Sequence, residues 1–273
     1  MIRKINIRRG LQASHWLVVL AIYFLIPRIS FSQNVYNTGS SLTIKSGTVI
    51  YIKGSYIHSD GDIDNDGEVN IVDSLVNNDA GFGVFGDPAN RPIAGTVTFE
   101  GITDQQISGT GMPVIFYNFK FKSASLSTFK LFRQFEVGGQ LIFEAGNINL
   151  NGRLIDLGTT GNLSGETNAR RISGSAGYIT ASRNLPIGFN GEIADFGLHI
   201  DVGVNNFGPT EVRRSHFALK PFSSNGNINR FYDFRPSNPG LDPAPTLIMD
   251  FFDNETLPGH TLSDYKIFHS FKD

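Results

Sequence analysis

Short alternating segments follow one another from Gly95 to Gly152, and this pattern dominates the chain. Within each segment apolar residues recur at every second position, and Gly, Ser, Asn or Thr interrupts the alternation before the next segment begins. Period-two alternation predicts strands with one buried face, and no helical period of 3.6 extends over ten or more residues beyond residue 32. We therefore predict an all-β protein of many short strands. The apolar pairs in this stretch are Val97 and Phe99, Phe119 and Phe121, Phe135 and Val137, Leu141 and Phe143, and Ile148 and Leu150.

A motif of glycine followed by alternating apolar residues, Gly-x-φ-x-φ, repeats along the chain. The intervals from Gly47 to Gly67 and from Gly67 to Gly95 are 20 and 28, and the interval from Gly95 to Gly139 is 44, which equals two turns of 22. A loose period of about 20 residues is typical of a β-solenoid, in which each coil lays its strands on the coil below. The alternative is a sandwich whose hairpins share turn residues. The six starts are Gly47, Gly67, Gly95, Gly139, Gly146 and Gly152.

Several short segments within residues 95–158 resemble segments of a known group of proteins. GTVTFEG, DQQISGTG, FYNFKFKSA and FEVGGQLIFEAGNINLNGRLIDLG are similar to the β-helix repeats of large secreted Bacteroidetes surface proteins, the adhesin-like cargo of type IX secretion. The resemblance covers roughly residues 39–184. It implies a right-handed parallel β-helix and an adhesin-like role, and it identifies no catalytic residues.

The sequence pattern changes near Leu185 and Pro186. Beyond this point the predicted strands are longer and proline is frequent in the predicted turns. This favours an antiparallel β-sandwich-like module over residues 185–273, following a solenoid domain over residues 33–184. The module also resembles the segment after the β-helix in the same surface proteins. We recognise no type IX sorting domain, so we expect either another export route or a fragment of a longer protein. The expected strands are Phe196–Val202, Glu211–Pro221, Ile228–Arg235, Thr246–Phe252 and Tyr265–Phe271.

Residues 1–32 have the layout of a signal peptide. Basic residues precede an apolar run from Trp16 to Pro27, and Ser30 and Ser32 place small side chains where signal peptidase reads them. We predict cleavage before Gln33. The alternative is an uncleaved membrane anchor, but the apolar run is shorter than the roughly 20 residues that a spanning helix needs. The basic residues are Arg3, Lys4, Arg8 and Arg9.

Composition narrows the classes of function. Hydrophobic residues make up 40% of the chain, and the 30 Gly and 23 Phe suit tight turns and apolar strand faces. The net charge of −2 gives no electrostatic footprint for nucleic acid, so we expect no nucleic-acid partner. With no cysteine, the chain has no disulfide, thiolate metal site or cysteine nucleophile. An exported chain without cysteine suits a bacterial surface or extracellular protein.

The segment from Asp62 to Asp73 is the strongest candidate for a ligand site. As a twelve-residue calcium loop it places carboxylates at positions 1, 3, 5 and 12, glycine at 6, a backbone carbonyl at 7 and asparagine at 9. It resembles the first half of a dockerin repeat, although no second copy follows. The alternative is a polar corner between two strands, for which Asp, Asn and Gly are the usual residues. The candidate calcium ligands are Asp62, Asp64, Asp66, Glu68, Asn70 and Asp73.

Evidence for catalysis is weak. The histidines show no metal-binding spacing, and the GxSxG and P-loop motifs are absent from the sequence. A β-helical polysaccharide lyase or hydrolase is the enzyme worth testing, because such enzymes use carboxylates and basic residues on an outer face. The candidates would be Asp156, Glu166, Arg170, Arg171 and Arg183. They share no recognisable spacing, so we expect no catalysis.

The aromatic residues allow two interpretations, a carbohydrate-stacking platform or a packed core, and we favour the core. We thus expect a secreted or cell-surface structural, adhesin-like solenoid that binds glycans or envelope partners without catalysis. The alternatives are a calcium-binding dockerin-like module and the polysaccharide enzyme. The aromatic candidates are Phe116, Tyr117, Phe119, Phe121, Phe129, Phe132 and Phe135.

Overall fold

The computed structural model describes residues 33–81, 83–86, 91–123, 127–217, 228–238 and 244–256. These residues form strands and one short 3-10 turn, Asp253–Glu255, and contain no α-helix. The described residues all belong to one compact unit. The predicted signal peptide lies outside the described residues. Within those ranges, no helix is long and apolar enough to cross a membrane.

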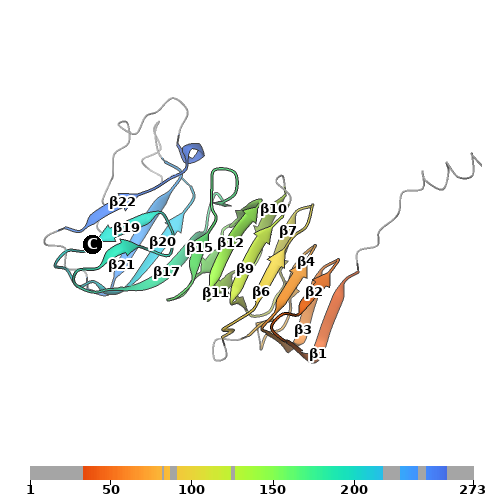
Figure 1. Ribbon diagram of the computed structural model, residues 1–273. Coiled ribbons are helices and arrows are strands. Elements are labelled where there is room, and N and C mark those ends of the chain that lie inside the picture. The colour runs from red at the N-terminus through yellow and green to blue at the C-terminus, as the bar shows by residue number, and fades with distance from the viewer. Residues whose placement is uncertain are drawn as a thin grey trace, which may run out of the picture. The chain divides into compact units, whose positions relative to one another are not determined.

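Two sheets consist of parallel strands only (Figure 1). Sheet 1 contains, in spatial order, β1 (Val35–Ile44), β3 (Tyr56–Asn65), β5 (Leu75–Asn77), β7 (Gln105–Ser108), β10 (Thr128–Leu131), β13 (Asn147–Asn149) and β16 (Ile172–Ser173). Sheet 2 contains β2 (Val49–Ile52), β4 (Glu68–Ile71), β6 (Thr96–Phe99), β9 (Asn118–Lys122), β12 (Gln140–Ala145) and β15 (Asn162–Ser164).

A third sheet is parallel at one end and antiparallel at the other, and a fourth is antiparallel throughout. Sheet 3 runs β8 (Val114–Phe116), β11 (Phe135–Val137), β14 (Leu154–Asp156), β17 (Tyr178–Leu185), β20 (Gly208–Ser215) and β21 (Phe231–Pro236). Sheet 4 runs β18 (Asn190–Glu192), β19 (Leu198–Asp201) and β22 (Thr246–Met249).

The chain winds through these sheets as a β-solenoid. From β7 onward it visits sheets 1, 3 and 2 in turn, and each strand pairs with the equivalent strand of the next coil. In sheet 2, Val97 pairs with Phe119, Phe119 with Leu141 and Leu141 with Leu163, and each pairing is a step of 22 along the chain. Val69 pairs with Val97, a step of 28. The predicted solenoid and its period are therefore confirmed, and parallel pairing excludes a sandwich of hairpins for these coils.

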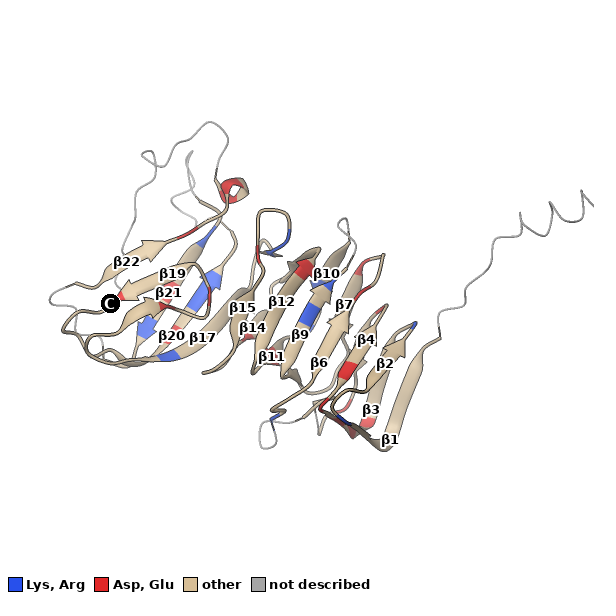
Figure 2. Cartoon of the chain, viewed as in Figure 1, with Lys and Arg blue, Asp and Glu red and all other residues tan. Residues whose placement is uncertain are grey.

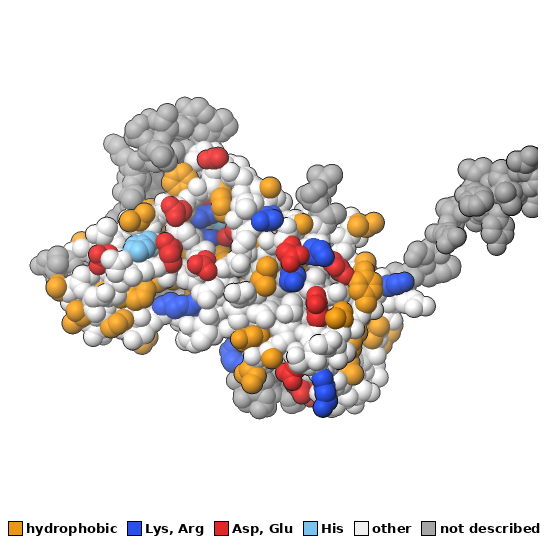
Figure 3. All heavy atoms as spheres, in the orientation of Figure 1, with side chains coloured by type: hydrophobic (Ala, Val, Ile, Leu, Met, Phe, Trp, Pro, Cys, Tyr) orange, Lys and Arg blue, Asp and Glu red, His pale blue; other side chains and the backbone are white. Residues whose placement is uncertain are grey.

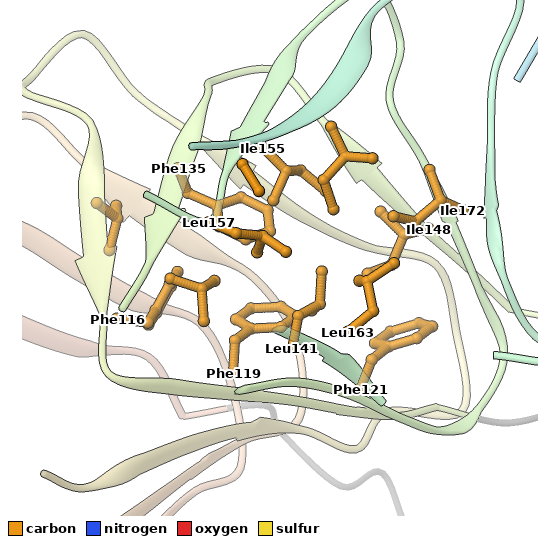
Figure 4. Close-up of a cluster of buried hydrophobic side chains, with 14 of the residues drawn as sticks. Phe116, Phe119, Phe121, Phe135, Leu141, Ile148, Ile155, Leu157, Leu163 and Ile172 are labelled. Carbon is orange, nitrogen blue, oxygen red and sulfur yellow. The ribbon is translucent and has the colours of Figure 1, made fainter. Parts of the chain in front are cut away.

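Inward-facing side chains fill the solenoid. Figure 4 shows labelled residues of several coils, including Phe119, Leu141 and Leu163 of sheet 2, converging on one apolar cluster. Phe119 is fully buried, and its ring centroid lies 4.9–5.4 Å from those of four other phenylalanines. The prediction that the aromatic residues form a core is confirmed for Phe116, Phe119, Phe121, Phe129 and Phe135, whereas Phe132 is 40% exposed and Tyr117 is half-buried.

Buried asparagines and glycines turn the corners. The Asn65 side chain accepts a hydrogen bond from the Gly67 amide, and Asn77, at the end of the next strand of sheet 1, accepts the equivalent bond from the Asp79 amide. Gly95 adopts a φ of +79°, and a Cβ there would lie 2.0 Å from the Asn65 carbonyl oxygen. Only glycine fits such a close backbone approach. Gly67, whose Cβ would lie 2.4 Å from the Thr48 carbonyl oxygen, and Gly95 thus mark points where one coil passes over another.

The parallel stack changes character at β17. This strand pairs in parallel with β14 at one edge and antiparallel with β20 at the other. The predicted domain boundary at residue 184 falls inside this strand. Four of the five strands expected beyond residue 185 correspond to β19, β20, β21 and β22, and the fifth, Tyr265–Phe271, lies outside the described residues. Arrangement of this region as a β-sandwich-like module stays a prediction.

Candidate functional site

The six candidate calcium ligands are spread over two strands and two corners. Asp62 and Asp64 lie in β3, and Glu68 and Asn70 lie in β4, across the turn that contains Asp66. Several of the side chains already have partners: Ser41 donates to Asp62, Thr98 to Glu68, and Ser55 and Ser74 to Asp73. Within the described ranges, no three acidic or histidine side chains are close enough to hold a metal ion. Calcium binding by this segment stays a prediction.

The five lyase candidates do not converge on one site. Arg170 donates to the carbonyls of Gly165 and Glu144, Arg171 to that of Asn168, and Arg183 to those of Gly158, Gly161 and Ser182. Asp156 accepts from the Gly158 amide in a corner. These four side chains tie coils and corners together. Glu166 alone belongs to a larger charged cluster.

Glu166 forms a buried ion pair with Arg214 of β20. The Arg214 Nη2 lies 2.6 Å from the Glu166 Oε2, and the two side chains are 1% and 8% exposed. The guanidinium also donates to the carbonyl of Phe196 at 2.9 Å and to the His216 Nε2 at 3.1 Å. The other Glu166 oxygen accepts from the Ile172 amide. The pair therefore links the last coil, which contains β16, to the antiparallel strands.

A second buried ion pair joins the first through His216. The His216 Nδ1 lies 3.2 Å from the Glu255 Oε1, and the other Glu255 oxygen lies 2.8 Å from the Arg230 Nη2. Glu255 also accepts from the Phe252 amide, and Arg230 donates to the carbonyl of Asp250. We call Glu166, Arg214, His216, Glu255 and Arg230 the closing network. Figure 2 shows basic and acidic positions interspersed over this antiparallel part of the chain.

Burial and neighbouring charges fix the protonation states of the closing network. Burial, together with the charge of Arg214, lowers the pKa of His216 to about 4. Burial alone would raise the pKa of Glu255, but the hydrogen bond from His216 and the charge of Arg230 lower it to about 2. Burial alone would raise the pKa of Glu166, but the charge of Arg214 and the other neighbouring charges and hydrogen bonds together lower it. At neutral pH both glutamates are ionised and His216 is neutral.

A hollow of about 390 Å³ lies beside the closing network. Glu166, Arg214 and Arg230 line its inner side. Leu163 and Ser164 contribute from β15, Gly165 from the position after it, and Asp195 and Gly197 from the turn before β19. Asp250, Phe251 and Phe252, which follow β22, complete it. Of these residues, only Glu166 was predicted from the sequence as a catalytic candidate.

One residue that was not predicted, Arg214, could have been recognised from the pattern of its strand. Thr210, Val212 and Arg214 occupy alternate positions of one strand and are all buried, so Arg214 lies on the inward face that Val212 marks. A charged residue in phase with buried apolar neighbours indicates an internal ion pair. Its partner, Glu166, lies 48 positions earlier in the sequence, and no local spacing reveals it.

Comparison of the chain with family models, with curated proteins and with solved structures finds no match.

Proposed function

We propose that this chain is an exported structural or adhesin-like solenoid protein that presents its outer faces to glycans or cell-envelope partners without catalysis. The observation that carries the proposal is the filled, three-sided stack. Strand edges are used in coil-to-coil pairing, and apolar side chains occupy the interior. Such a stack leaves its outer faces as the surface available for contact, held in place by a stiff backbone.

The outer face of sheet 2 illustrates the repeated surface. Lys120, Ile142 and Ser164 occupy equivalent, partly exposed positions in three successive coils, at steps of 22 along the chain. Neighbouring strands lie about 4.8 Å apart, so such positions form rows at regular spacing. Lys120 is ion-paired with Glu144, which joins the outer faces of two coils. A regular row of side chains suits many weak contacts made at once, which raises avidity without any single deep site.

The closing network supports a non-catalytic role. General acid–base catalysis needs a group whose pKa lies near the working pH. The pKa values of His216 and Glu255, about 4 and about 2, lie well below neutrality, and both side chains are only 3% exposed. Each charged group of the network faces a partner within the protein. The cluster therefore suits a structural connection better than proton transfer.

The proposal of export rests on the signal-peptide pattern of residues 1–32, the absence of cysteine and the resemblance to secreted surface proteins. These features support a location outside the cell.

The experiment pairs a binding assay with an activity screen on the full-length chain. We expect saturable binding to a subset of immobilised glycans or to isolated bacterial envelopes, and no product from a panel of anionic polysaccharides. Turnover of any polysaccharide that disappears in a folded Glu166→Gln variant, but persists in the exposed control Asp60→Asn, would contradict the non-catalytic proposal. Absence of binding to every glycan and envelope preparation would contradict the adhesive role.

A further inference from the structure

We infer that the hollow beside the closing network is a binding site for a neutral sugar ring, whose hydroxyls bond to Asp195, Asp250 and Arg230. This inference rests on the proposed glycan-binding function and gives it a location. The hollow, at about 390 Å³, falls within the range of roughly 300–1,000 Å³ that small-molecule sites occupy.

Two carboxylates at the hollow supply acceptors. Asp195 and Asp250 are exposed, and neither side chain accepts a hydrogen bond from any residue in the described part of the chain. The backbone of Asp250 is already bonded, since its amide donates to Gly197 and its carbonyl accepts from Arg230. Glu192 lies close enough that burial, followed by the charges of Asp250 and Asp195, raises its pKa. In Figure 3, acidic side chains gather around a few basic ones over β19 and β22.

Arg230 supplies a donor. Its side chain is only 4% exposed, and its Nη1 and Nη2 face the Asp250 carbonyl and the Glu255 carboxylate. Its Nε is buried and has no hydrogen-bond partner among the described residues. An unpaired buried donor is costly, and a ligand acceptor would remove that cost. The guanidinium carbon lies 4.9 Å from the centre of the Phe252 ring, which gives the same part of the hollow an aromatic wall.

The combination of two carboxylates and a guanidinium at the hollow favours a ligand without net charge. A simple anion would bond to Arg230 but would meet the carboxylates of Asp195 and Asp250. A simple cation would suit the carboxylates but would leave the Arg230 Nε without an acceptor. A sugar hydroxyl both donates and accepts, so a neutral ring satisfies both kinds of group while its C–H face lies on Phe252.

The turn that presents Asp195 is held in an uncommon conformation. Ala194 and Asp195 have φ values of +53° and +56°, in the left-handed region that side chains other than glycine rarely adopt. Ala194 is buried and the Phe196 amide donates to the Ile193 carbonyl, so the surrounding fold maintains the turn. Successive positive φ values are typical of hairpin turns, and this turn between β18 and β19 holds Asp195 in place before a ligand binds.

Saturation-transfer difference NMR on the full-length chain tests the site. The probes are the methyl glycosides of glucose, galactose, mannose and N-acetylglucosamine, with glucuronate and glucosamine as charged counterparts. We expect at least one neutral glycoside to receive saturation and to outcompete its charged counterpart. No transfer to any neutral glycoside at millimolar concentration, or stronger transfer to a charged sugar, would overturn the inference.

Two substitutions test whether the saturation transfer arises from binding in the hollow. Asp195→Asn keeps a residue that tolerates the left-handed turn, and Asp250→Asn changes an exposed side chain, so both variants should fold. Each should weaken binding about tenfold, because a hydrogen bond to a charged acceptor contributes roughly 1.5 kcal/mol. Asp60→Asn, an exposed carboxylate in β3 outside the candidate calcium ligands, is the matched control and should bind normally. Equal affinity of all three variants would overturn the assignment of the site.

The outcomes separate this inference from the proposed function. If immobilised glycans or envelopes bind the Asp195→Asn and Asp250→Asn variants as well as the unaltered chain, the hollow is not the site, yet the adhesive function stands. If the unaltered chain binds no glycan or envelope, the proposed function fails.

Discussion

Two buried regions hold this protein together in opposite ways. The coils around β6 to β12 are filled by phenylalanine rings, which contact several neighbours at once. The closing network between the last coil and the antiparallel strands is instead built from charges that each require a particular partner. Apolar contacts accept many alternatives of similar volume, whereas a buried ion pair specifies one arrangement. Apolar packing thus stabilises the repeated coils, and buried ion pairs stabilise the end of the stack.

The largest effect should come from Phe119→Ala, at the centre of the apolar region. Removal of a fully buried ring that contacts four others leaves a cavity, and we expect a loss of about 5 kcal/mol in the free energy of unfolding. Urea denaturation at neutral pH measures it. Phe132→Ala is the control, because Phe132 is 40% exposed, and it should cost less than about 1 kcal/mol. Similar costs for both variants would mean that the cluster is not the core of the stack.

Arg214→Met should have the next largest effect. It leaves the carboxylate of Glu166 buried without its partner, and we expect a loss of about 4 kcal/mol. The neighbouring Arg213 is the matched control: its side chain is 23% exposed and pairs with Glu211 on the outer face, so Arg213→Met should cost less than about 1 kcal/mol.

A double variant tests whether the charges act as a pair. Glu166→Gln combined with Arg214→Met removes the unpaired charge and should recover part of the loss. Additive losses would show that the two side chains contribute independently, contrary to the pairing described above.

His216 should make stability depend on pH. Its pKa is about 4 in the folded protein and 6.5 as the ordinary value, so between these values the unfolded chain binds more protons. Stability should therefore fall on acidification from pH 6.5 to pH 4, by on the order of 3 kcal/mol. The lowered pKa values of Glu166 and Glu255 act in the same direction below pH 4.5.

Denaturation of His216→Gln over the same pH range isolates the contribution of this residue. The variant should lose less stability on acidification than the unaltered chain. Some dependence should remain, because burial also lowers the pKa of His58. An unchanged dependence on pH would mean that His216 is not the buried neutral group described above.

The smallest effect concerns the predicted calcium loop at Asp62 to Asp73, in the repetitive part of the chain. Calcium at a concentration equal to its Kd would stabilise the fold by roughly 0.4 kcal/mol, which a small rise in Tm would report. Asp64→Asn should abolish the rise. An unchanged Tm at millimolar calcium would contradict the prediction.

The repetitive region could be predicted from the sequence because each coil repeats the same pattern of inward apolar positions and corner residues. The interval from Gly95 to Gly139 is 44, and the pairing of Val97 with Phe119 and then Leu141 reproduces the two steps of 22. The interval of 28 between Gly67 and Gly95 likewise reappears as the pairing of Val69 with Val97. Local alternation and glycine spacing suffice wherever inward side chains and corners repeat.

The closing region was harder to predict because its determinants are not local. The sequence of β17, YITASRNL, is compatible with either parallel or antiparallel partners. The side chain of Arg214 has its ion-pair partner 48 positions earlier in the chain, and that of Glu255 lies 39 positions after His216. Nothing in a single sequence states which distant charges meet. The hollow depends on these same long-range contacts, so it could not be predicted either.

The two edges of β17 set a rule for how the length of this protein can change. Any additional coil must enter before β17, because the antiparallel partner β20 occupies the other edge. Each insertion would require about 22 residues with inward apolar positions and a corner glycine, and would lengthen the stack by about 4.8 Å. Duplication of one coil within residues 96–161 would therefore lengthen the stack in fixed increments and leave the closing network unaltered.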